Sequence, residues 1–189
     1  MMNVRQALRL VLVFVGAHLV GYLVAGTIAI QFFYPGFWDG PSPLFQPFLR
    51  TMNEPELWSH AVLWQFPGQV ARALLMALLL LPIAAKLREL TLGRRFLFLG
   101  GLLFFYTHLL AAAPSPANIE GFIYMRPEFV RAAFWRCQPE MVLYALLAGF
   151  LTARFLFKRK AAPQAGRDTS RRARRQSLSC IDSTDSVSV

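Results

Sequence analysis

The sequence is poor in charge and in cysteine. Lys, Arg, Asp and Glu together make up 16% of its 189 residues, against about 25% in an ordinary soluble domain. A water-soluble globular fold is therefore not expected. The two cysteines, Cys137 and Cys180, form no CxxC pair, which excludes a disulfide scaffold and a zinc site of ordinary ligand spacing.

Sequence motifs of common enzyme classes are also absent. The chain contains no GxSxG, HExxH, P-loop or GxGxxG pattern, so nothing points to hydrolase or nucleotide chemistry. The carboxylates in the two outer loops, residues 34–60 and 114–140, are scattered and not paired for acid–base catalysis. They are Asp39, Glu54, Glu56, Glu120, Glu128 and Glu140. We therefore do not expect an enzyme.

Hydrophobic residues and positive charge are abundant. Hydrophobic residues make up 56% of the chain, the mean hydropathy is +0.42 and the formal net charge is +10. A hydrocarbon core of about 30 Å takes roughly 20 helical residues to cross. Four segments meet that need: 8–33, 61–85, 96–113 and 141–157. We expect an all-α polytopic membrane protein whose four transmembrane helices form a compact antiparallel bundle.

The positions of Lys and Arg predict the orientation of these segments. Of the 20 Lys and Arg, 15 lie before the first segment or near its start, between the second and third, or at and after the end of the fourth. Four lie in the two outer loops, so the positive-inside rule places both termini in the cytoplasm. In the second outer loop, residues 126–136 start with Pro127 and Glu128 and carry apolar residues at helical spacing, which predicts a short interfacial helix.

Small residues recur at a spacing of four in the first and fourth segments. They are Ala17, Gly21 and Ala25 in the first, and Ala145, Gly149 and Ala153 in the fourth. Helices in lipid approach one another closely at such positions. We expect these residues to pack helices within the chain, with dimerisation or a chance spacing as the alternatives.

Each segment also carries one polar residue at nearly the same depth, and we call these four residues the polar layer. They are His18, Arg72, His108 and Tyr144. All lie about 15–20 Å from the inner ends of their segments at about 1.5 Å per residue. Gln65 and Gln69 share a helix face with Arg72.

Arg72 is open to two interpretations. No Asp or Glu lies in any of the four segments, so a lipid headgroup or a small anion could supply the missing negative charge through the bidentate geometry of guanidinium. Alternatively, Arg72 snorkels outward to a structural ion pair with Glu140, which lies about 6 Å further out by the same count. The structural role is the more common one.

The histidines do not predict a cofactor. His18 and His108 would be the pair for bis-histidine haem ligation, but no local motif brings His60 or Cys137 to them as further metal ligands. A histidine hydrogen-bonded inside a helix bundle is the commoner case. We expect neither a cofactor nor a metal.

Residues 158–189 differ in character from the rest. They are rich in Ser and Arg and almost free of large apolar side chains, which predicts disorder. The basic residues of this tail predict contact with anionic lipid headgroups at the cytoplasmic face. They include Lys158, Arg159, Lys160, Arg171, Arg172, Arg174 and Arg175. No aromatic residue is interleaved with them for base stacking, so nucleic acid is not an expected partner.

The second outer loop and the fourth segment resemble a known pattern. It is carried by Arg126, Pro127, Glu128, Val130 and Arg131, followed by Tyr144 and Gly149. This stretch resembles uncharacterised bacterial four-span integral membrane proteins, although the loop lacks the pattern's histidine and Ala145 stands where the pattern has Gly. The resemblance implies a bacterial inner-membrane location and no known activity.

Together these features predict a multi-pass integral membrane protein that acts as an accessory or scaffolding subunit. Its expected partners are the lipid bilayer and other membrane subunits. The alternative function is a carrier or sensor of a small anion or lipid headgroup centred on Arg72.

Overall fold

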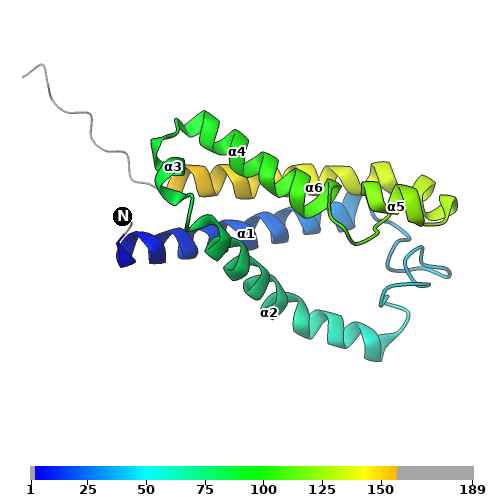
Figure 1. Cartoon of the computed structure of the whole chain (residues 1–189). Coiled ribbons are helices and arrows are strands. Elements are labelled where there is room, and N and C mark those ends of the chain that lie inside the picture. Colours follow the sequence, from blue (N-terminus) through cyan, green and yellow to red (C-terminus); the bar gives the residue numbers. More distant parts are fainter. Residues whose placement is uncertain (1–2, 157–189) are drawn as a thin grey trace, which may run out of the picture. The chain divides into compact units, whose positions relative to one another are not determined.

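The computed structural model describes residues 3–156, and this part of the chain consists of helices and connecting loops without a strand (Figure 1). The predicted all-α class is confirmed. The basic tail and the headgroup contacts predicted for it lie outside the described residues.

Two long helices begin the chain. Helix α1, Val4–Phe32, starts at a capping box in which the Asn3 side chain accepts from the Gln6 backbone N–H and the Gln6 side chain accepts from the Asn3 backbone N–H. Helix α2, Pro55–Leu80, starts with proline in its first turn, where no N–H is needed. By length and composition, these two helices are long and apolar enough to cross a membrane.

The connection between α2 and α4, which we call the inner connection, comes next in the chain and is followed by the third predicted segment. Helix α3, Ala84–Glu89, is a short turn of helix. Helix α4, Leu92–Phe104, starts at Thr91, whose side chain accepts from the backbone of Arg94. It continues into η1, Phe105–Leu109, a single π-helical turn. The helix over Leu92 to Leu109 thus lies within a few residues of the predicted segment 96–113.

The second outer loop differs from the prediction. The expected separate interfacial helix over 126–136 is wrong, because these residues form the outer part of α6, a continuous helix over Pro127–Phe155. Its path through Pro139 is held by buried side chains on both sides, Cys137 before it and Tyr144 after it. Proline is tolerated in such helices when neighbouring elements hold them. The short helix of this loop is instead α5, Ile119–Tyr124.

Helix α6 lies between α1 and α4 and packs against both (Figure 1). A Cβ atom added to Gly21 would lie 3.0 Å from the Cβ of Ala148, and one added to Gly149 would lie 2.8 Å from the Cα of Gly100. The small residues therefore permit close helix approach inside this chain, and their predicted packing role is confirmed.

Helix α2 is only partly joined to this three-helix group. It packs on α1, and its buried residues, Ala73, Ala77 and Leu80, all lie in its C-terminal half, which we call the inner half. The N-terminal half, which we call the outer half, diverges from α1 (Figure 1). Ala73 and Ala77 are four residues apart and allow close approach, whereas the outer half carries bulky side chains such as Trp64. The described part of the chain therefore does not confirm the predicted compact four-helix bundle.

The first outer loop, residues 33–54, forms a small core together with residues of α1 and α6. Phe37 and Phe45 are buried together with Tyr34, and the guanidinium of Arg136 lies 4.1 Å above the centre of the Phe37 ring. The same guanidinium donates to the carbonyl of Phe33 at 2.8 Å. This loop is therefore fixed to the outer part of α6 and is not a free linker.

Candidate functional site

The best-defined polar cluster of the described residues is centred on His18 of α1. The Tyr144 hydroxyl on α6 donates to His18 Nδ1 at 2.6 Å, and His18 Nε2–H donates to Oε1 of Gln69 on α2 at 3.0 Å. This arrangement suits a neutral imidazole with its proton on Nε2. His18 is 1% exposed, so the cluster ties three helices together at one level.

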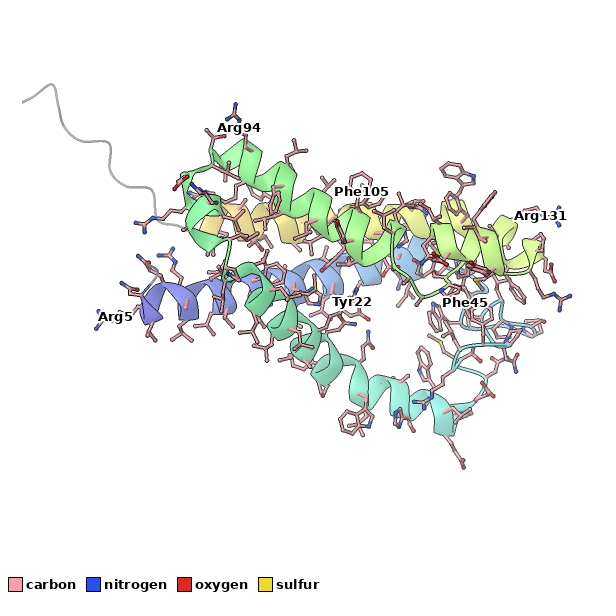
Figure 2. All side chains as sticks on the ribbon, viewed as in Figure 1. Arg5, Tyr22, Phe45, Arg94, Phe105 and Arg131 are labelled. Carbon is pink, nitrogen blue, oxygen red and sulfur yellow. The ribbon has the colours of Figure 1, made fainter. Side chains whose placement is uncertain are left out.

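A second polar pair lies one turn further along the same two helices. Gln65 Nε2 of α2 donates to the Tyr22 hydroxyl of α1 at 2.9 Å, and Figure 2 shows Tyr22 between the two helices. Both residues line a cleft of about 120 Å³ between α1 and α2. Its other walls are Leu19, Leu23, Val62, Phe66 and Gln69. The cleft is therefore apolar with a few polar groups at its side.

Arg72 lies on the face of α2 next to this cluster. Its side chain is exposed and makes no hydrogen bond or ion pair among residues 3–156. Arg72 follows Gln69 by three residues and shares its face of α2. Of the polar layer, the structure thus brings His18 and Tyr144 into contact and leaves Arg72 beside them.

Glu140 is not the partner of Arg72 in the structure. Its carboxylate accepts a hydrogen bond from the hydroxyl of Tyr34, which follows the end of α1. Burial and the neighbouring carboxylate raise the pKa of Tyr34 far above its usual range. In the described part of the chain, the ion pairs are Lys86–Glu89 and Arg126–Glu128, both at the surface.

His108 belongs to a separate cluster. Its Nε2 bonds to Gln138 Oε1 at 3.1 Å, and Gln138 Nε2 donates to the carbonyl of Ala117 at 2.8 Å. Gln138 lies six residues before Tyr144 on α6, which is about 9 Å further out. The four residues of the polar layer therefore do not meet in one cavity.

Sequence reasoning missed the most extensively bonded arginine. The predicted segments place Arg95 in the loop just before residue 96, but in the structure it is 8% exposed. Its guanidinium donates to the carbonyls of Leu87, Leu90 and Ala153 at 2.8, 2.9 and 3.0 Å. It thereby joins the inner connection to the end of α6. The N-cap at Thr91 was the available signal, because it places Arg95 within the first turn of α4.

The His18 cluster has the features of a structural contact between helices. Both nitrogens of His18 are engaged, and no serine, cysteine or carboxylate among residues 3–156 bonds to it as a nucleophile or an orienting group. Within the same range, no three His, Cys, Asp or Glu residues lie together as metal ligands would. Arg72 and the neighbouring cleft are the parts of this region open to another molecule.

Comparison of the chain with protein-family models, with curated proteins and with solved structures gives no match in any of the three.

Proposed function

We propose that the chain is an integral membrane protein with four membrane crossings, located in the bacterial inner membrane with both termini in the cytoplasm. The crossings are α1, α2, α4 with η1, and α6. The 29 residues of α6 make a helix of about 43 Å, and α4 with η1 measures about 25 Å. Both lengths are sufficient for a core of about 30 Å once flanking residues are counted.

The distribution of burial and charge supports this placement. The most apolar stretch of α1 is 28% buried and that of α2 is 11% buried, whereas the core helix of a soluble protein is mostly buried. Figure 2 shows Arg5 and Arg94 near one end of the helices and Arg131 near the other. The end with Arg5 and Arg94 holds the larger number of basic residues and is cytoplasmic under the positive-inside rule.

Within the membrane, the role we propose is that of an accessory or scaffolding subunit that holds a partner's helix against α2. The observation that carries this proposal is the unpacked outer half of α2. Val62, Leu63 and Phe66 are 57%, 69% and 56% exposed there. Tyr22 and His18 each bond to one polar atom of Gln65 and Gln69, respectively. Lipid tails cannot hydrogen-bond to the other polar atom of these amides, whereas polar side chains of a neighbouring helix can. The cleft of about 120 Å³ is close to the roughly 150 Å³ of an engineered cavity that binds benzene, which is room for one side chain.

A photo-crosslinking residue at Phe66 tests the subunit role. In native membranes we expect it to form an adduct with one membrane protein. The same residue at Leu97, which is 75% exposed on α4, serves as the matched control and should react with lipid. Lipid adducts alone at both positions would contradict a partner at α2.

A second candidate function is binding of an anion or a lipid headgroup at Arg72. The observation that favours it is the exposed guanidinium without a carboxylate partner among the described residues. An arginine at the centre of a membrane helix costs about 2.5–3.5 kcal/mol on insertion scales. An anion held in bidentate fashion would offset part of this cost.

Native mass spectrometry with phosphatidylglycerol tests the Arg72 site. Arg72→Gln should lose bound lipid while the protein still accumulates, whereas Arg94→Gln at an exposed position should retain it. Competition by inorganic phosphate would indicate a small-anion site, and no competition would indicate a lipid site. Lipid retention in Arg72→Gln, or its failure to accumulate, would argue against this function.

A further inference from the structure

Helix α5 exposes most of its large apolar side chains. Phe122, Ile123 and Tyr124 are 72%, 60% and 72% exposed, and Ile119 is 43% exposed. Only the small residue Gly121 is buried in this helix. A short helix in a solvated loop would be expected to carry polar residues on its outer side. In α5, by contrast, the large apolar side chains are on the outer side.

The loop holds α5 rigidly in this position. Asn118 is 2% exposed, and its Oδ1 accepts from the backbone N–H groups of Ser115 and Gly121 at 3.0 and 2.8 Å. Its Nδ2 donates to the carbonyls of Ala111 and Ala113 at 3.2 and 2.8 Å. One side chain therefore caps α5 and fixes the preceding turn. The exposure of the apolar side chains is built into the fold.

The depth of α5 follows from the position along α6 of the residue that it contacts. Counted outward from Phe155 at about 1.5 Å per residue, Gln138 lies at about 26 Å and Trp135 at about 30 Å. The bond from Gln138 Nε2 to the Ala117 carbonyl brings the start of α5 to the level of Gln138. From there, α5 runs beside the outer part of α6 (Figure 1).

This level coincides with the outer boundary of a membrane. With Arg154 at the inner boundary, a hydrocarbon core of about 30 Å ends near Trp135. Trp135 is 78% exposed, and Trp and Tyr favour the interface. The exposed charges of Glu128 and Arg131 lie about 36–40 Å from Phe155, beyond this boundary.

We infer that α5 inserts Phe122, Ile123 and Tyr124 into the outer leaflet, at the boundary between the headgroups and the acyl chains. Its partner is therefore phospholipid. The exposed charges that follow α5 in the chain, Glu128 and Arg131, lie on the water side, and Glu120 lies in the first turn of α5. This inference rests on the proposed membrane location. Under this inference, the interfacial helix of the second outer loop is α5, and not residues 126–136 as the sequence predicts.

Spin labels at single cysteines test the inference. The full chain carries Cys137→Ala and Cys180→Ala and is reconstituted in vesicles of phosphatidylethanolamine and phosphatidylglycerol. Labels at Phe122→Cys and, separately, Ile123→Cys should collide several-fold more often with oxygen, which dissolves in the bilayer, than with a water-soluble nickel chelate. Leu97→Cys on α4 is the control within the membrane, and Glu128→Cys is the control in water.

Each other outcome overturns the inference in a distinguishable way. If the labels on α5 behave like the label at residue 128 while residue 97 remains oxygen-accessible, α5 lies in water and the membrane location is retained. If residue 97 also favours the nickel chelate, the proposed membrane location fails together with the inference. If the labels on α5 meet neither reagent, protein covers this helix and lipid is not its partner.

Discussion

At the scale of single residues, the basic side chains that are bonded inside the fold find backbone carbonyls and neutral groups as partners. Arg95 and Arg136 donate to carbonyls near the ends of helices, and His18 is bonded to a tyrosine and a glutamine. Positive charge near helix C-termini is favourable because the last carbonyls of a helix lack partners. A buried arginine in this chain is therefore no sign of a binding site by itself. Arg72 differs because it is exposed in the middle of α2 and makes no such bond with the described residues.

Removing the Tyr144 hydroxyl should weaken the His18 cluster. Tyr144→Phe leaves His18 Nδ1 without a donor inside the fold, at a cost of about 1 kcal/mol, as is typical of such bonds between membrane helices. We expect the midpoint of thermal unfolding in detergent to fall by about 2–4 °C. Tyr106→Phe, at a residue that is 70% exposed, should leave the midpoint unchanged. Equal effects of the two substitutions would show that the bond to His18 contributes nothing.

Replacing Arg95 should destabilise the protein more than Tyr144→Phe does. Arg95→Gln removes charge-assisted bonds to several carbonyls, and we expect a loss of about 2–4 kcal/mol, or roughly 5–10 °C in the unfolding midpoint. The neighbouring exposed Arg94 provides the comparison, since Arg94→Gln removes the same charge without these bonds. A midpoint for Arg95→Gln within 1–2 °C of the Arg94→Gln value, on that scale, would refute the structural role of Arg95.

At the scale of helices, close approach depends on a few glycines and alanines. Two helices cross α6 where Gly21 meets Ala148 and where Gly149 meets Gly100. The packing role of Gly21 and Gly149 was predictable, because spacing by four on one helix face is a local property of the sequence. Their partners, Ala148 and Gly100, were not predicted. The continuity of α6 through Pro139 was not predictable, because it depends on burial of Cys137 and Tyr144 against elements distant in sequence.

Adding one methyl group at the closest contact tests this packing. Gly149→Ala would place a Cβ atom 2.8 Å from the Cα of Gly100, which forces α4 and α6 apart. We expect destabilisation of about 1–3 kcal/mol, measured as a lower unfolding midpoint. At Gly16 of α1 an added Cβ meets nothing within 4 Å, so Gly16→Ala should be neutral or stabilising through helix propensity. A neutral Gly149→Ala would mean that the α4–α6 contact is looser than described.

At the scale of the whole described chain, the sequence predicted the helices better than their association. Hydrophobic length located four helical segments, but depth counted from predicted ends put His108 level with His18, whereas in the structure His108 bonds about 9 Å further out on α6. Likewise, the pairing of Glu140 with Tyr34 and not with Arg72 depends on the path of the first outer loop, which no local pattern encodes. The divergence of the outer half of α2 from α1 also depends on three-dimensional packing, which no local sequence pattern encodes.

We propose that four helices cross a membrane with the basic end in the cytoplasm. The most direct measurement is labelling of single cysteines by a membrane-impermeant maleimide on intact cells, in a chain with Cys137→Ala and Cys180→Ala. Native Cys137 is unsuitable as a reporter because it is 8% exposed. Glu56→Cys and Arg131→Cys should react on intact cells, whereas Asn3→Cys and Lys86→Cys should react only after permeabilisation. Labelling of Lys86→Cys from outside, or equal labelling of all four positions on intact cells, would contradict the claim.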